Sequence, residues 1–194
     1  MEKERIKRMA KVVAKFEKVS FEQFRKDFWD CFSKVDMANV MGMIPDENGF
    51  DTAIRKVYDA IKLPKRGTVG SAGYDFFAPA KIKLAPRQTV KIPTGIRCRI
   101  DNDWVLKCYP RSGLGFKYRM QLNNTVGIID SDYYGADNEG HIMAKITNDT
   151  NENKTIEIES GKGFMQGIFV EYGITEDDTT NGIRTGGFGH TDKK

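Results

Sequence analysis

The sequence is poor in the residues that build most metal centres and disulfide frameworks. It has two histidines, His141 and His190, and three cysteines, Cys31, Cys98 and Cys108. No Cys-x-x-Cys or His-Glu-x-x-His pattern occurs, so we expect no zinc site. The cysteines are odd in number and lack paired spacing, and no secretory apolar segment precedes them. These features favour a reducing cytoplasm over a disulfide framework.

Long apolar runs and a strong charge imbalance are also missing. The 31 Lys and Arg residues against 27 Asp and Glu residues give a net charge of +4 over 194 residues, with histidine counted as neutral. This charge suits a small anionic ligand as well as a nucleic acid, so alone it indicates neither. The apolar runs are far shorter than a membrane span. The length and a hydrophobic content of 39% indicate one domain with a core and at most a small appendage.

Residues 1–62 are expected to form a largely helical N-terminal extension. Ser20 precedes Gln23 by three residues, a spacing typical of the capping box at a helix start. Apolar residues then recur at steps of three and four on one face: Phe21, Phe24, Phe28, Phe32 and Val35. We expect this face to pack on the rest of the protein, with the docking of another protein as the alternative.

The rest of this extension gives weaker signals. Residues 39–49 have the composition of a loop, and residues 50–61 have the pattern of a second helix. The opening at residues 1–18 is basic and partly amphipathic, as expected of a solvated helical face. Contact with nucleic acid or membrane is the alternative, but no aromatic platform accompanies the charges. We therefore expect neither as a partner.

From residue 63 onward the apolar residues recur with a period of two. Many short strands without helices between them indicate an antiparallel sandwich or barrel. We expect this mainly β domain to cover residues 63–183, followed by a flexible glycine-rich arm at 184–194. The alternating segments, separated by turns rich in Gly, Pro and Asn, are residues 90–95, 96–101, 103–109, 141–149, 154–160 and 163–172.

Five stretches carry more polar chemistry than a β scaffold needs. "SAGYDFFAP" places Asp75 after a glycine turn, and "YPRSGLGFKY" places Arg111 at a Gly-punctuated turn suited to phosphate. "NNTVGIIDSDYYG" runs from apolar residues into Asp130, a carboxylate that could accept a proton from water. "GKGFMQGIF" puts the amide of Gln166 inside an apolar strand, where it needs a partner. The fifth is the arm "RTGGFGHTDK", in which Phe188 stands among glycines.

In this order the five stretches resemble the five motifs of the trimeric dUTPase family, the dUTP nucleotidohydrolases. The matching segments are "AGYD", "PRSGLG", "VGIIDSDYYG", "GFMQG" and "RTGGFG". The extension is similar, more loosely, to that of some Gram-positive and phage-type members. The resemblance implies a jelly-roll-like β-barrel and a homotrimer whose subunits share active sites. It also implies hydrolysis of dUTP to dUMP and pyrophosphate.

The resemblance further implies a role for individual residues. Asp130 would be the general base that activates the water attacking the α-phosphorus. Tyr133 would lie under the deoxyribose and exclude a ribose 2′-hydroxyl. Asp75 would help to place Mg²⁺, through water. Phe188 would stack on the uracil when the arm of another subunit closes over the nucleotide.

The remaining implied contacts divide by the part of the nucleotide they hold. The uracil edge would bind Asn124 and the hairpin backbone at Gly127 and Ile129. The phosphates would bind two sets of residues. The first set is Arg111, Ser112, Gly113 and Gln166, and the second, from the arm, is Arg184, Gly189, His190 and Thr191.

The chain departs from the family pattern in three places. Tyr134 stands where an arginine is usual, the extra stretch "GADNEG" follows at residues 135–140, and His190 replaces a serine. Two alternatives to the hydrolase remain open. One is a dUTPase-like module that mainly binds a regulatory protein. The other is dCTP deaminase, suggested by "EGHI" at residues 139–142, although Lys145 stands where that enzyme carries its glutamate.

Overall fold

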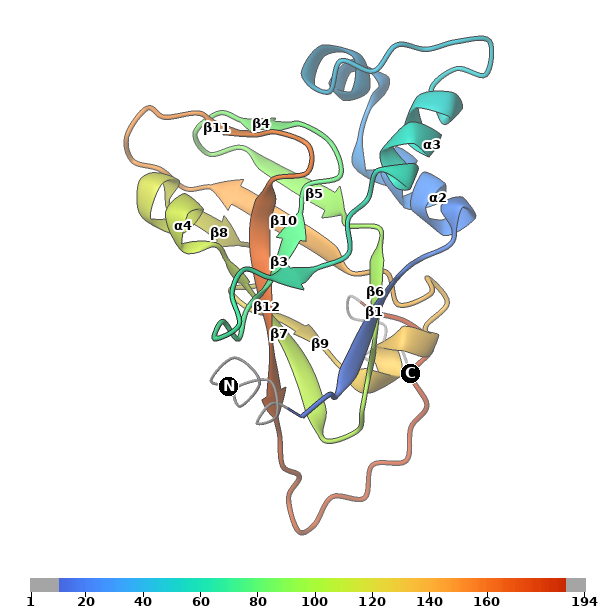
Figure 1. Ribbon diagram of the computed structural model, residues 1–194, viewed down its shortest axis with the longest axis vertical. Helices are drawn as coiled ribbons and strands as arrows, with labels where there is room; N and C mark the ends of the chain where they lie inside the picture. Colours follow the sequence, from blue (N-terminus) through green and yellow to red (C-terminus); the bar gives the residue numbers. More distant parts are fainter. Residues whose placement is uncertain (1–10, 188–194) are drawn as a thin grey trace.

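The computed structural model describes residues 11–187 of the 194-residue chain. The arm residues Phe188, Gly189, His190 and Thr191, all named above as candidate substrate contacts, lie outside this range. Figure 1 shows a β-barrel with a helical lobe on one side of it. In chain order the elements are β1 (Ala14–Lys18), α2 (Phe21–Cys31), η1 (Asp36–Val40), α3 (Asp51–Asp59), β2 (Lys65–Arg66), β3 (Tyr74–Phe77), β4 (Ile82–Leu84), β5 (Thr89–Pro93), β6 (Ile96–Ile100), β7 (Trp104–Pro110), α4 (Ser112–Tyr118), β8 (Met120–Leu122), β9 (Gly127–Ile129), η2 (Ser131–Gly135), β10 (Met143–Asn148), β11 (Ile156–Ile158) and β12 (Gly163–Glu171).

The strands pair antiparallel, which confirms the expected mainly β fold. The largest sheet has five strands in the order β2-β3-β12-β7-β9, and β5-β10-β8 form a second sheet. Two strand pairs, β1-β6 and β11-β4, complete the barrel. Alternate residues of the strands point inward, as in β6, where Ile96, Cys98 and Ile100 are buried. Each predicted alternating segment therefore contains a strand.

Strand β1 is an element that the sequence pattern did not predict in the N-terminal segment, whose other elements, α2, η1 and α3, are helical as expected. Its five residues pair with β6, with Phe16 opposite Cys98. The Phe16 ring lies 5.3 Å from that of Tyr74 and 5.6 Å from that of Phe76, measured between centroids. These aromatic contacts come from β3, so β1 is part of the barrel and the pairing decides its conformation.

The helical lobe has a hydrophobic core of its own. The hydroxyl of Ser20 accepts a hydrogen bond from the Gln23 backbone N–H, which confirms the predicted cap. Phe24 and Phe28 of α2 are fully buried, so the apolar face packs inside the protein as expected. The helix ends at Cys31, earlier than the apolar pattern suggests, and Val35 is 64% exposed.

The turn predicted around Arg111 is the start of a short helix. Arg111 is the N-cap residue of α4, and Ser112 and Gly113 are exposed in its first turn. Leu114 and Tyr118, four residues apart on one face, pack against the barrel core. This pair of contacts makes about two turns of helix stable where the sequence indicates only a glycine turn.

Candidate active site

A pocket of about 250 Å³ opens beside the turn that joins β8 to β9. These two strands do not form the expected hairpin, because β8 pairs with β10 and β9 pairs with β7. Three of its lining residues, Asn124, Gly127 and Ile129, were predicted to bind the uracil edge. A Cβ atom at residue 127 would lie 3.1 Å from Cys108 Cβ, so glycine lets β9 approach β7 closely. The other lining residues are Val126, Ile128, Tyr133, Met143, Arg184 and Gly187.

Two carboxylates stand at the edge of this pocket and share one guanidinium. Asp130 is the N-cap residue of η2, directly after β9. Arg184 Nη2 lies 2.5 Å from Asp130 Oδ2, and its Nε lies 2.8 Å from Asp132 Oδ1. Asp130 and Asp132 are about half exposed, whereas the arginine side chain is mostly covered. The predicted base and the first predicted arm contact are therefore side by side.

Tyr133 forms one wall of the pocket and is held by hydrogen bonds at its far end. Its side chain is 6% exposed. The hydroxyl donates to the His141 carbonyl at 2.9 Å and accepts from Asn138 Nδ2 at 2.8 Å. Burial raises the pKa of Tyr133, and the Asn138 hydrogen bond opposes this only in part. The ring is thus a fixed, neutral surface.

The start of the arm lies on this wall of the same chain. Figure 1 shows the segment after β12 looping away and returning beside η2. The Asp137 backbone N–H donates to the Thr185 carbonyl at 3.0 Å. A Cβ atom at Gly187 would lie 2.7 Å from the Tyr133 ring, so glycine permits close contact there. Residues 184–187 therefore cover the pocket of their own subunit, whereas the family resemblance assigns the arm and this motif to different subunits.

The remaining predicted residues form a second group around strands β3, β7 and β12. Arg111 Nε lies 3.1 Å from Asp75 Oδ1. Asp75 pairs with Gln166 across β3 and β12, and Gln166 donates to the Pro110 carbonyl at 3.2 Å. Ser112 begins α4 beside this group. An exposed arginine, a hydroxyl and an amide in this arrangement suit an anionic phosphate chain.

The two groups lie apart within one chain. Ile129, which precedes Asp130, pairs with Leu106 of β7, whereas Gln166 pairs with Tyr109 of the same strand. Three residues along a strand span about 10 Å, and β9 and β12 flank β7 at two strand spacings, again about 10 Å. The pocket and the phosphate group are therefore separate parts of the monomer surface.

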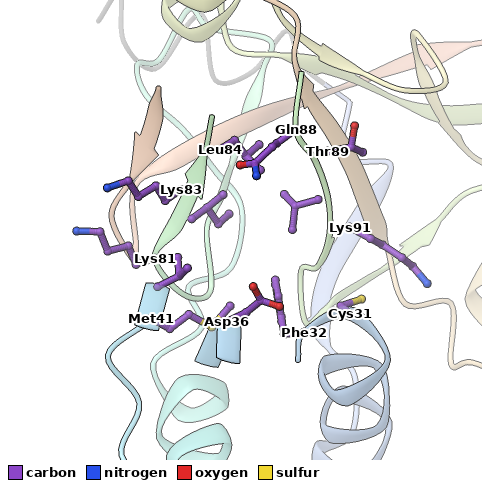
Figure 2. A pocket seen from close by; sticks show the side chains of 13 residues that line it. Cys31, Phe32, Asp36, Met41, Lys81, Lys83, Leu84, Gln88, Thr89 and Lys91 are labelled. Atoms are coloured by element: carbon purple, nitrogen blue, oxygen red, sulfur yellow. The ribbon is translucent and has the colours of Figure 1, made fainter. Parts of the chain in front are cut away.

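A second cavity, of about 290 Å³, lies between the helical lobe and β4–β5. In Figure 2 its lysines Lys81, Lys83 and Lys91 point away from the centre. Lys81 pairs with Glu159, Lys83 with Glu157, and Asp36 accepts hydrogen bonds from Ser33. Because these polar groups already have partners, this cavity is a weaker candidate for a polar substrate than the pocket at Tyr133.

Other kinds of chemistry find little support among residues 11–187. No cluster of three or more His, Cys, Asp or Glu side chains in this range could hold a metal ion. Burial raises the pKa of Cys31 to about 11 and that of Cys108 to about 12, so neither thiol is a thiolate nucleophile near pH 7. Lys145 is exposed on β10, outside the lining of the pocket. None of the helices in the described part of the chain is long and apolar enough to cross a membrane.

Comparison with known proteins identifies the family. Residues 59–191 match the family model described as dUTPase. The chain belongs to the dUTPase family. The deoxyuridine 5′-triphosphate nucleotidohydrolase of Lactococcus lactis subsp. lactis is 38% identical over 146 residues, which cover 74% of this chain and 96% of the relative.

Solved structures agree with this assignment. The crystal structure of dUTPase from Streptococcus mutans has a TM-score of 0.53 and 36% identity, over 59% of this chain and 88% of that chain. A dUTPase of Staphylococcus bacteriophage 80alpha, with a TM-score of 0.51, is 23% identical over 66% of this chain and 90% of that chain, a likeness of fold alone. In this dUTPase family member, residues 11–58 lie outside the family match and are nevertheless folded onto the barrel.

Some residues at the site escaped the sequence analysis. Asp132 was part of a noted motif, but nothing in the spacing showed that it would share Arg184 with Asp130. Asn138 and His141 hold the Tyr133 hydroxyl from within or beside the extra stretch at 135–140. Such contacts depend on how the loop folds back, and no local pattern encodes them.

Proposed function

We propose that this dUTPase family member is a dUTP diphosphatase, hydrolysing dUTP to dUMP and pyrophosphate. The observation that carries the proposal is the pocket between the β8–β9 turn and Tyr133, with Asp130 at its edge. A uracil-sized opening lined by backbone, a buried tyrosine wall and an adjacent carboxylate are the parts needed for base, sugar and water. The 38% identity to a named deoxyuridine 5′-triphosphate nucleotidohydrolase supports the same activity.

Asp130 is the proposed general base. It removes a proton from the water that attacks the α-phosphorus, the bond from that phosphorus to the bridging oxygen breaks, and pyrophosphate leaves. Because Arg184 contacts the Asp130 carboxylate, the base becomes free when the guanidinium moves to the phosphates. The same arginine then balances the negative charge of the triphosphate. No covalent intermediate is needed.

Discrimination of the nucleotide follows from the two walls of the pocket. Asn124 and the backbone at Gly127 and Ile129 offer a fixed set of hydrogen-bonding groups to the uracil edge. Cytosine would leave these groups mispaired once the bound base covers them, which costs about 1–3 kcal/mol per group. The ring of Tyr133, fixed at its hydroxyl, lies under the deoxyribose and leaves no room for a ribose 2′-hydroxyl.

The phosphate chain is assigned to the second group, supplied by another subunit. Arg111, Ser112, Gly113 and Gln166 offer a guanidinium, a hydroxyl, backbone N–H and an amide. Because this group lies apart from the pocket in one chain, we propose that a neighbouring copy contributes one of the two groups to each site. We therefore propose a cyclic homotrimer with shared sites. The arm residues Phe188, Gly189, His190 and Thr191, which lie outside the described residues, are proposed to complete each site.

Mg²⁺ is the proposed cofactor, and Asp75 is the residue proposed to place it. Mg²⁺ prefers oxygen donors and is usually held by one or two carboxylates together with substrate phosphates. Asp75 offers one half-buried carboxylate beside Arg111, which fits an ion shared with the triphosphate and does not form a cage alone. When bound, the ion would neutralise phosphate charge. The proposed units remain an extension at 1–62, from which β1 joins the barrel, a barrel domain at 63–183 and an arm at 184–194. The proposed location is the cytoplasm.

The decisive experiment measures pyrophosphate release from dUTP, dCTP, dTTP and UTP, with and without Mg²⁺. Release from dUTP alone is expected, and Asp130→Asn should lower it by about 10²–10⁴-fold while leaving nucleotide binding intact. Asp132→Asn is the matched control, because it removes the neighbouring carboxylate that also contacts Arg184. Equal losses in both variants, or no release in the folded wild type, would contradict the assignment.

The shared site needs a separate test. Asp130→Asn subunits mixed with Arg111→Gln subunits should regain part of the activity, because some sites in mixed trimers carry both intact groups. Light scattering of each variant alone would establish that both assemble. If assembled mixtures stay as inactive as their parents, each site draws both groups from one chain.

A further inference from the structure

Three residues before or on α2 bind the segment that follows Asp130. Tyr134 donates a hydrogen bond to Glu17 Oε2 at 2.5 Å. The backbone N–H and the hydroxyl of Ser20 donate to the two oxygens of Glu139, at 2.7 and 2.5 Å. These partners are 117 and 119 residues apart in the chain.

The third contact joins His141 to Asp27, and the geometry shows which of the two side chains donates the hydrogen bond. His141 is fully buried, and its Nε2 accepts the Gly95 backbone N–H at 2.7 Å. That nitrogen therefore carries no proton, so the proton of the neutral ring is on Nδ1, which lies 2.5 Å from Asp27 Oδ2. Burial raises the pKa of Asp27, but hydrogen bonds from His141 and Gln23 outweigh it and hold the pKa below its ordinary value of 3.8.

His141 also forms a hydrogen bond with Tyr133, the residue that forms one wall of the pocket. Its carbonyl accepts the Tyr133 hydroxyl at 2.9 Å. Between them the chain passes Gly140, at φ +67°, where a Cβ atom would lie 2.5 Å from the Tyr133 carbonyl oxygen. Residues 135–140 are thus folded tightly onto Tyr133, and α2 binds the outer side of this fold through Asp27.

We propose that the N-terminal extension is a brace for the active-site loop. Through Glu17, Ser20 and Asp27 it fixes residues 131–141, and thereby the position of the Tyr133 ring that selects deoxyribose. Asp27, Glu139 and His141 are positioning residues, since none of them lines the pocket. The proposal rests on the role given to Tyr133 under the proposed function.

The test compares variants that cut the brace with a matched variant that does not. Asp27→Ala removes the acceptor of the His141 proton, and Asp27→Asn keeps an acceptor oxygen of the same shape. Asp30→Ala is the control, because Asp30 is exposed on the same helix. Tyr134→Phe removes only the hydroxyl that reaches Glu17 and leaves α2 unaltered.

The first readout is selectivity, the ratio of kcat/KM for dUTP to kcat/KM for UTP. This ratio does not depend on how much of the sample is folded. We expect Asp27→Ala to lower it by about tenfold or more, the scale of one misplaced contact. Asp27→Asn should restore most of it, Tyr134→Phe should lower it less, and Asp30→Ala should not change it. An unchanged ratio in Asp27→Ala would overturn the brace.

The second readout needs no catalysis and separates this proposal from the proposed function. Hydrogen–deuterium exchange of residues 131–141 should quicken in Asp27→Ala and, to a smaller degree, in Tyr134→Phe, with Asp30→Ala like the wild type. If wild type fails to hydrolyse dUTP but exchange responds in this way, the brace stands and the assigned reaction falls. If exchange in this segment is the same in all variants, the brace is refuted whatever the activity.

Discussion

Replacing Gly140 by alanine tests how tightly the loop after Asp130 is fitted to the pocket wall. Two costs add at this position. The backbone has φ +67°, a conformation that costs an L-residue about 1–2 kcal/mol. A Cβ atom would also lie 2.5 Å from the Tyr133 carbonyl oxygen and 2.8 Å from Tyr134 Cα. Both are backbone atoms, which cannot rotate away as a side chain can.

Overpacking of this kind costs about 1–3 kcal/mol. We therefore expect Gly140→Ala to lower the free energy of unfolding by about 2–5 kcal/mol in total. At about 3 °C per kcal/mol for a chain of this size, Tm should fall by about 6–15 °C. Urea unfolding and calorimetry at one protein concentration would measure this, since assembly makes Tm depend on concentration.

Alanine substitutions at two other glycines separate the backbone cost from the packing cost. Gly42 has φ +65° with no atom within 4 Å of its Cβ position, so Gly42→Ala should show the backbone cost alone. Gly135, in the same loop as Gly140, has neither a left-handed φ nor a neighbour within 4 Å, so Gly135→Ala should be nearly neutral. If Gly140→Ala is no more destabilised than Gly42→Ala, the loop is not packed against Tyr133 and the reasoning fails.

Three further predictions concern the site and the helical lobe. Arg184→Gln should lower kcat/KM for dUTP by about 10–100-fold, since a hydrogen bond to a charged group contributes about 1.5–3 kcal/mol. A faster rate would mean that the arginine only restrains Asp130. Phe28→Ala should cost about 3–5 kcal/mol in urea unfolding because Phe28 is fully buried, and a cost under 1 kcal/mol would mean that the lobe is not a packed core. Because the folded pKa of Asp27 lies below 3.8, the stability gap between wild type and Asp27→Asn should be constant above about pH 5 and shrink below 3.8. A gap that instead closes between pH 6 and 7 would contradict the assignment of this charge to Asp27.

The fold could be predicted largely because its signals are local. The period of two places a strand in every alternating segment beyond residue 63, and Ser20 with Gln23 marks the start of α2. Strand β1 was missed for the opposite reason. Its five residues include alternating Lys15, Phe16 and Glu17, too short a run to separate a strand from a helix, and its conformation depends on pairing with β6, some eighty residues later.

The candidate site likewise has one part that a local motif predicts and another part that depends on long-range contacts. Asn124, Gly127, Ile129 and Tyr133 lie within ten residues, so one motif brings them to one pocket, with Asp130 beside it. The chain segments that hold this motif in place come from far away. The contact of Ser20 with Glu139 spans 119 residues, and that of Asp27 with His141 spans 114. The periodicity of the sequence does not predict such pairs, because only tertiary packing brings them together.

Two of the three departures from the family pattern are explained physically by these long-range contacts. Tyr134 stands where arginine is usual, and its hydroxyl reaches Glu17. Glu139, in the extra stretch, receives both donors of Ser20. Without the extension, Glu139 would be a half-buried carboxylate that has lost two charge-assisted hydrogen bonds, each contributing about 1.5–3 kcal/mol. The extra loop and the extension outside the family match therefore stabilise each other, and neither is explained by the barrel alone.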